Sequence, residues 1–229
     1  MPTALVLSDL HGRWDKARDV MTKNKGVEYI LVAGDITNFG SELDAAKVLD
    51  ALQIGPTRPV ILAVPGNCDT VAVRKYLVDN GVSIEQRVVV LPIGNVAGVG
   101  GGLKRAGITP YERTEMELRS GAEHVLKQVA HTRSKLPTIM VSHTPPYGSN
   151  ADLRHGQHVG SYELAGLMNT FCPQVWVCGH IHESPCVSME DETLIVNPGP
   201  CANGNYAVLT FRIGEDGSVS IRGKLEHLA

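Results

Sequence analysis

Clustered positive charge is missing from this sequence of 229 residues. Its 21 Lys and Arg residues are fewer than its 24 Asp and Glu residues, and the formal net charge is -3. No basic run is longer than Lys104-Arg105. Because binding to the backbone of long DNA or RNA depends on several clustered cations, we expect no long nucleic acid as a partner.

A long uninterrupted apolar run is also missing. The longest apolar region, residues 88–103, contains Pro92, Asn95 and five glycines, so it is not expected to span a membrane. Asp9 and His11 interrupt the apolar stretch near the N-terminus, which argues against a secretory signal peptide. The five cysteines are odd in number and show no Cys-x-x-Cys spacing, a pattern that favours reduced thiols. We therefore expect a cytoplasmic protein without a membrane partner.

The bulk composition is that of an ordinary globular chain. Hydrophobic residues make up 43% and charged residues 20% of the sequence. A chain of this length can bury a substantial core. The sequence has no internal repeat, low-complexity segment or linker composition, so a single domain over residues 1–229 is predicted. The sequence leaves the oligomeric state open and allows a homo-oligomer.

Short apolar runs alternate with amphipathic stretches along most of the chain. The runs are residues 5–7, 30–33, 61–64, 139–141 and 175–177, and helices are expected near residues 13–24, 41–53, 70–80, 112–135 and 160–171. Continuous apolar strands separated by helices are typical of an α/β fold whose sheets are covered on both faces. We expect Asp69 or Thr70 to cap the third helix.

The end of the sequence has a different pattern. Residues 184–196 and 206–225 alternate between apolar and polar side chains, as β-ribbons do. Glu215-Asp216-Gly217 predicts a hairpin turn within the second of these segments.

Each of the five apolar runs is followed by side chains that can bind a metal ion. These candidate ligands are Asp9, His11, Asp35, Asn67, His143, His180 and His182. A single one has an ordinary explanation, but ligands in α/β sheets gather beyond the carboxyl ends of the strands. Carboxylates and imidazoles suit Mn, Fe, Ni or Zn. Seven ligands are too many for one ion and suit two ions that share a carboxylate, an arrangement that binds phosphate oxygens.

These motifs resemble those of the calcineurin-like metallophosphoesterases. The matching blocks are Asp9-Leu-His11, Gly34-Asp35, Gly66-Asn67-x-Asp69, Ser142-His143 and Gly179-His180-Ile-His182, and their order and spacing cover roughly residues 5 to 200. The resemblance implies a four-layer αββα sandwich with two mixed β-sheets and a centre of two divalent metal ions. It also implies two ligand sets that share Asp35 as a bridge: Asp9, His11, Asp35 and His182 for one ion, and Asp35, Asn67, His143 and His180 for the other.

The segment after the fourth block is similar to that of small phosphodiesterases of the Icc-like branch. It reads His143-Thr-Pro-Pro-Tyr-Gly and is followed by His158-Val-Gly-Ser. The resemblance implies a phosphodiesterase for small phosphodiesters or nucleotide derivatives, with attack by a hydroxide that bridges the metals. Asn67 would stabilise the phosphoryl oxygens, Asp69 would support the loop, and His158 would shape the substrate pocket. A phosphomonoesterase and a non-catalytic nucleotide-binding or scaffold protein on the same fold remain the alternatives.

Cys68 departs from the family pattern. Most members carry His at this position, where it donates a hydrogen bond to the phosphoryl group or protonates the leaving oxygen. A nucleophilic thiol is disfavoured because a metal-bound hydroxide would already fill that role. Cys68 as a third kind of metal ligand is possible but unnecessary, and a small buried thiol needs no function. The favoured interpretation is an inert or weakly donating replacement for the general acid.

The run Gly98-Val-Gly-Gly-Gly102 invites comparison with nucleotide-binding loops. Leu103 occupies the position where a dinucleotide fingerprint requires Gly or Ala, and no Gly immediately precedes Lys104 as the Walker pattern requires. We expect a glycine-rich strand end that packs close to the site.

Overall fold

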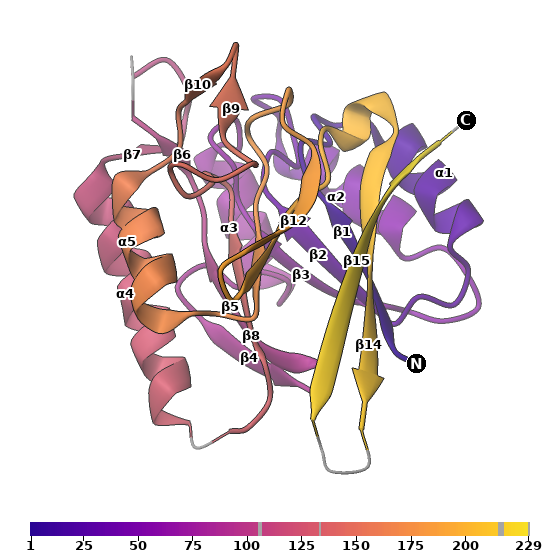
Figure 1. Ribbon diagram of the computed structural model, residues 1–229. Helices are drawn as coiled ribbons and strands as arrows, with labels where there is room; N and C mark the ends of the chain where they lie inside the picture. The colour runs from indigo at the N-terminus through magenta and orange to yellow at the C-terminus, as the bar shows by residue number, and fades with distance from the viewer. Residues whose placement is uncertain (105–106, 133, 215–217, 229) are drawn as a thin grey trace.

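Two β-sheets lie face to face, with helices on both outer sides (Figure 1). The structure is a computed structural model that describes residues 1–104, 107–132, 134–214 and 218–228. The first sheet has the strand order β15-β14-β1-β2-β3. Its strands are β1 (Thr3–Leu7), β2 (Tyr29–Ala33), β3 (Val60–Val64), β14 (Asn205–Ile213) and β15 (Val219–His227). β1, β2 and β3 are parallel, whereas β14 pairs antiparallel with both β1 and β15.

The second sheet has the strand order β12-β13-β11-β8-β5-β4. Its strands are β4 (Val88–Leu91), β5 (Gly94–Val99), β8 (Thr138–Ser142), β11 (Val175–Val177), β12 (Cys186–Glu190) and β13 (Thr193–Asn197). The four central strands are parallel and the two edge strands are antiparallel to their neighbours. Two short ribbons accompany the sheets: β6 (Gly102–Leu103) with β7 (Glu112–Arg113), and β9 (Leu153–Arg154) with β10 (Gln157–His158).

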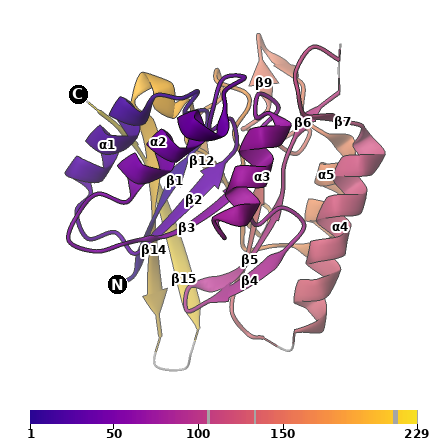
Figure 2. The same ribbon diagram turned by 180° about the vertical axis from the view of Figure 1, so that it is seen from behind.

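All five expected helices are present, with ends within a few residues of the predicted ones. They are α1 (Trp14–Lys23), α2 (Glu42–Leu52), α3 (Val71–Asp79), α4 (Glu115–His131) and α5 (Tyr162–Phe171), and a short 3-10 helix covers Cys201–Asn203. The helices α1, α2 and α3 pack against the first sheet, while α4 and α5 pack against the second (Figure 2). No helix in the described part of the chain combines the length and the apolar character needed to cross a membrane.

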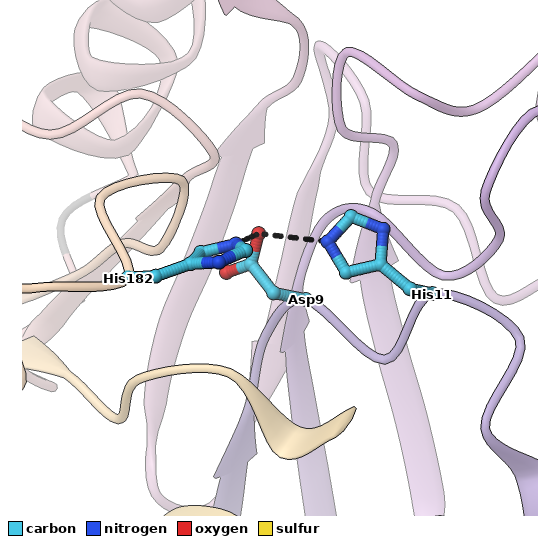
Figure 3. Close-up of side chains that lie close together, drawn as sticks. All are labelled: Asp9, His11 and His182. Atoms are coloured by element: carbon cyan, nitrogen blue, oxygen red, sulfur yellow. Dashed lines mark hydrogen bonds and ion pairs between the residues drawn. The ribbon is translucent and has the colours of Figure 1, made fainter. Parts of the chain in front are cut away.

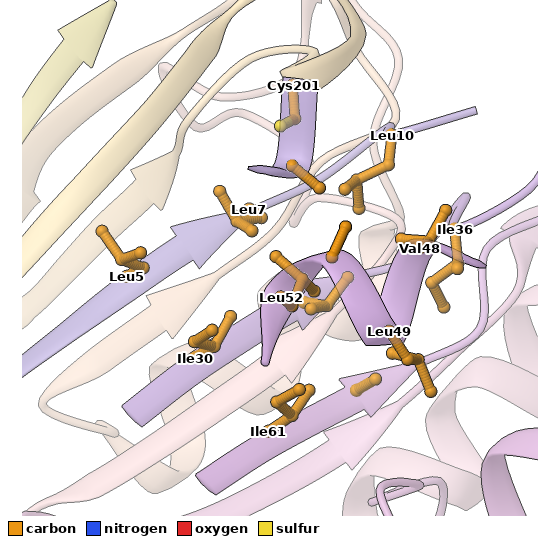
Figure 4. Packing of buried hydrophobic residues seen from close by; sticks show 14 of the residues in the cluster. Leu5, Leu7, Leu10, Ile30, Ile36, Val48, Leu49, Leu52, Ile61 and Cys201 are labelled. Atoms are coloured by element: carbon orange, nitrogen blue, oxygen red, sulfur yellow. The ribbon is translucent and has the colours of Figure 1, made fainter. Parts of the chain in front are cut away.

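The strands are apolar on both faces because both faces of each sheet are covered. In β1, Leu5 and Leu7 pack beneath the helices (Figure 4), whereas Ala4 and Val6 pack against the other sheet. In the second sheet, Met140 faces α4 and α5. Alternate residues of one strand therefore enter different apolar layers. These layers confirm the predicted four-layer αββα sandwich with two mixed sheets.

Thr70, and not Asp69, caps α3. The Thr70 hydroxyl accepts a hydrogen bond from the Val73 amide at 3.4 Å. The β-ribbons expected near the end of the chain are β12–β13 and β14–β15. The hairpin turn predicted at residues 215–217 lies outside the described residues. All five cysteines are free of disulfide bonds.

Candidate metal centre

The predicted metal ligands of both sheets meet at the carboxyl ends of the strands. Three groups of side chains place their ligand atoms within 4.8 Å of one another: Asp9 with His11 and His182, Asp9 with Asp35 and His143, and His11 with Asp35 and Cys68. Asp9 lies between two imidazoles, with its Oδ1 at 3.1 Å from His182 Nε2 and 3.9 Å from His11 Nε2 (Figure 3).

Asp35 lies between the two predicted ligand sets. Its Oδ1 is 3.5 Å from His143 Nε2, and its Oδ2 is 3.9 Å from His11 Nε2. The Asn67 side-chain oxygen is 2.9 Å from His143 Nε2, and the His180 ring centroid is 4.9 Å from that of His143. The structure thus brings the seven side chains together, with Asp35 where a shared carboxylate would have to be.

Four of these residues have left-handed backbone conformations. Their φ angles are 53° at Asp9, 46° at His11, 50° at Asp35 and 67° at His180. Such conformations of non-glycine residues cost about 1–3 kcal/mol each and are enriched at functional sites. Main-chain hydrogen bonds help to hold them, since Asp9 N donates to Gly34 O at 3.0 Å and His11 N donates to Asp35 O at 2.9 Å. This conformational signature supports a functional role for the strand ends.

Two motif glycines allow these loops to approach closely. A Cβ atom on Gly179 would lie 1.7 Å from Ser8 Oγ, and one on Gly66 would lie 2.1 Å from Asp35 Oδ1. Both positions therefore require glycine for packing around the carboxylates.

Asp69 joins the loops that follow β2 and β3. Its buried carboxylate accepts hydrogen bonds from Ile36 N at 3.1 Å, Thr37 N at 2.8 Å and Gly66 N at 2.8 Å. The Thr37 hydroxyl donates a fourth at 2.9 Å. Burial and the charge of Asp35 raise the pKa of Asp69, against the opposite effect of these backbone hydrogen bonds. Asp69 thus fixes the loops that carry Asp35 and Asn67.

The environment of His143 fits a bound cation. Its Nδ1 lies 2.7 Å from Ala33 O, which can only accept, so Nδ1 carries a proton. Its Nε2 lies 2.9 Å from Asn67 Oδ1, so this contact needs either a proton on Nε2 or a cation between the two acceptors. The amide nitrogen of Asn67 donates elsewhere, to Cys68 Sγ at 3.4 Å. An imidazole oriented by a backbone carbonyl is typical of metal-binding histidines.

The carboxylates and imidazoles of the candidate centre shift one another's pKa values. Burial disfavours the charged form of His143, but the carboxylates of Asp35 and Asp9 raise its pKa. Burial by itself would raise the pKa of Asp9, yet the hydrogen bond from His182 and the charge of His143 lower it well below its usual range. The hydrogen bond to Asp9 in turn raises the pKa of His182. Carboxylates together with neutral imidazoles are a ligand set that suits borderline divalent ions.

Cys68 lies beside the candidate centre, in one group with His11 and Asp35. Its amide donates to Asp35 Oδ1 at 2.8 Å, and its side chain is buried. Burial and the charge of Asp35 raise the pKa of the Cys68 thiol. Because the thiolate is the reactive form, this environment disfavours a nucleophile and agrees with the interpretation of Cys68 as a weak donor.

His158 is placed differently from the other predicted site residues. Its Nδ1 lies 2.5 Å from Asp152 Oδ1, and its ring centroid is 5.5 Å from that of Tyr147. A pocket of about 300 Å³ adjoins the candidate centre at Asn67 and His180. Of the described residues in the β9–β10 hairpin, Arg154 and not His158 lines this pocket. The role of His158 in shaping the substrate pocket stays a prediction.

Arg154 is a candidate functional residue that the sequence did not single out. It lies between the fourth block and His158 but belongs to none of the matching motifs. The hairpin brings it to the pocket beside Asn67 and His180, a placement that depends on tertiary structure.

Comparisons with known proteins agree with this arrangement. The family model described as calcineurin-like phosphoesterase matches residues 2–184. The protein MJ1162 of Methanocaldococcus jannaschii is 34% identical over 199 residues, which cover 85% of this chain and 86% of that protein. The crystal structure of TT1561 of Thermus thermophilus has a TM-score of 0.70 at 19% identity and covers 96% of this chain and 98% of that one. A dimetal phosphatase from Danio rerio has a TM-score of 0.63 at 11% identity, over 91% of this chain and 92% of that one. The two structures show the shared fold.

Proposed function

Because the chain belongs to the calcineurin-like phosphoesterase family, we propose that it is a phosphodiesterase that hydrolyses small phosphodiesters at two divalent metal ions. The observation that carries this proposal is the position of the Asp35 carboxylate between the two groups of ligands. Its oxygens lie 3.9 Å from His11 Nε2 and 3.5 Å from His143 Nε2.

Two sets of side chains would hold the ions. Asp9, His11, Asp35 and His182 would form one set, and Asp35, Asn67, His143 and His180 the other. When bound, the ions would activate water and neutralise charge on the phosphoryl oxygens. The proposal of two ions per chain is supported by the dimetal phosphatase from Danio rerio, which has the same fold.

The protein's own residues would position the reacting groups. The Ala33 carbonyl fixes the ring of His143, and Asp69 fixes the loop that carries Asn67. A thiol is a weak hydrogen-bond donor, so Cys68 would offer the substrate only a weak hydrogen bond. Without a strong general acid at this position, substrates with good leaving groups are favoured.

The adjoining pocket supports a diester over a monoester. A diester carries a second organic group, which a monoester lacks, and the pocket beside Asn67 and His180 offers a place for it. Its volume of about 300 Å³ is at the lower end for ligand pockets, which favours a small group over a polymer.

Metal titration combined with hydrolysis assays tests the proposal. Chelator-treated protein reloaded with Mn²⁺ should bind about two ions per chain, as a two-metal site requires. It should hydrolyse bis(4-nitrophenyl) phosphate with a higher kcat/KM than 4-nitrophenyl phosphate. Asp35→Asn should weaken binding of both ions and lower kcat/KM by more than about 100-fold, because a shared ligand is changed.

Asp79→Asn is the matched control. Asp79 lies at the end of α3 and pairs with the exposed Lys75, so this variant should retain both ions and the activity. Preference for the monoester would favour a phosphomonoesterase. Two bound ions with no hydrolysis of either ester would favour a binding or scaffold protein.

A further inference from the structure

The pocket beside the candidate metal centre has largely apolar walls. Leu103, Ile108, Val159 and Ile181 line it. Ile108 is 76% exposed, so its position is not explained by packing in a core. Apolar side chains gathered around a small hollow favour a flat organic group such as a ring.

Glu112 holds one wall of this pocket in place. Its carboxylate accepts hydrogen bonds from the backbone amides of Gly107 at 2.8 Å, Ile108 at 2.9 Å and Thr109 at 3.0 Å. These hydrogen bonds lower the pKa of Glu112 to about 2, and the one from the Thr109 amide has the largest effect. The negative charge of Glu112 is thus engaged by its own loop, and Ile108 is held at the pocket.

A second part of the pocket lining is a hydrogen-bonded hairpin that carries Arg154. Its turn has left-handed conformations at His155 and Gly156, with φ angles of 50° and 77°, which suit a tight two-residue connection. The buried Asp152 carboxylate accepts from Gly160 N at 2.9 Å, and Asp152 O accepts from the Val159 amide at 3.0 Å. Arg154 therefore projects from a fixed backbone.

The side chain of Arg154 is exposed to solvent and forms a long ion pair with Glu183. Its Nε lies 3.7 Å from Glu183 Oε1, and the two side chains are 57% and 45% exposed. An exposed ion pair of this length contributes little to stability. The guanidinium can therefore leave Glu183 and bind another anion with a small loss of free energy. Arg154 is the one Lys or Arg among the described residues that line the pocket. A guanidinium matches the planar geometry of a carboxylate.

We propose that Arg154 selects diesters whose second organic group is a ring bearing a carboxylate. The ring would lie between the apolar walls, and the carboxylate would bind the guanidinium. This inference rests on the proposed phosphodiesterase function and specifies the substrate class of the same site.

Two diesters with the same 4-nitrophenolate leaving group test the inference. One carries a 4-carboxyphenyl group and the other a neutral 4-carbamoylphenyl group. The Mn²⁺-loaded protein should show a KM about tenfold lower for the carboxylate, as expected for one charge-assisted hydrogen-bonded pair. Arg154→Gln should raise the KM for the carboxylate about tenfold and leave the KM for the carboxamide within about twofold. The kcat values should change little, since the contact is remote from the reacting bond.

Arg119→Gln is the matched control. Arg119 is also partly exposed and paired with a glutamate, at 2.5 Å from Glu163, but it does not line the pocket. This variant should retain the preference for the carboxylate. The Arg154→Glu variant reverses the charge at this position and should have a lower KM for the carboxamide diester than for the carboxylate diester.

The failures of the two ideas are distinguishable. Hydrolysis of both diesters with equal KM, or an unchanged preference in Arg154→Gln, would overturn the role of Arg154 and leave the phosphodiesterase function standing. Hydrolysis of neither diester by protein that binds two ions would overturn both.

Discussion

Replacement of Asp69 by alanine should be among the most destabilising single changes near the candidate site. The substitution removes the acceptor for three backbone amides, those of Ile36, Thr37 and Gly66, and for one hydroxyl. A buried donor left without a partner costs about 1–3 kcal/mol. Removing the buried charge and partial entry of water offset part of this sum, so we expect a loss of about 3–5 kcal/mol. That is a large share of the ~5–15 kcal/mol that stabilises a typical domain.

Asp69→Asn provides a graded comparison. The amide keeps one acceptor oxygen, but its nitrogen would face at least one backbone N–H group, which can only donate, so we expect about half the loss of the alanine variant. The free energy of unfolding should be measured by urea titration with a chelator present, so that bound ions do not contribute.

A remote carboxylate serves as the control for this experiment. Asp79→Ala removes an exposed partner of Lys75 and should leave the urea midpoint unchanged. A loss below about 1 kcal/mol for Asp69→Ala would refute the reasoning, because it would mean that the four donors find other acceptors.

Two further substitutions test the neighbours of the site. Cys68→Ala should leave hydrolysis of aryl diesters close to that of the parent protein, whereas Cys68→His should raise hydrolysis of unactivated alkyl diesters by ~10²–10⁴-fold, because an imidazolium can protonate a basic leaving group. Loss of aryl diester hydrolysis in Cys68→Ala with both ions bound would show instead that the thiol is catalytic. His158→Ala should change the kinetics for different substrates unequally without changing the metal content, and identical kinetics on every substrate would count against its role in the pocket.

The fold could be predicted because its signals are local and periodic. The run Leu5-Val6-Leu7 is apolar throughout because alternate side chains enter two different apolar layers, as expected for a sheet covered on both faces. The candidate ligands could be found for a related reason. Parallel strands bring their carboxyl ends to one edge, so residues at successive strand ends, such as Asp9 and Asp35, meet in space.

Features that depend on tertiary contact could not be read from the sequence. Asp69 and Thr70 are both suitable helix caps, and only the packing of β2 against β3 assigns Asp69 to the amides of neighbouring loops. The left-handed conformation of His180 is imposed by its surroundings and has no marker in a non-glycine residue. Arg154 enters the pocket through the arrangement of a hairpin that no motif specifies.

The position of β1 in its sheet has a consequence for biosynthesis. β1 lies between β2 and β14, and β14 spans Asn205–Ile213, so one edge of β1 stays open until residues beyond 200 have left the ribosome. The second sheet uses only residues 88–197 and can be complete before then. An emerging chain would thus expose one unpaired edge of an apolar strand for most of its synthesis, and such an edge invites pairing with other chains. Versions of the chain truncated before β14 should aggregate, even though they retain every candidate metal ligand.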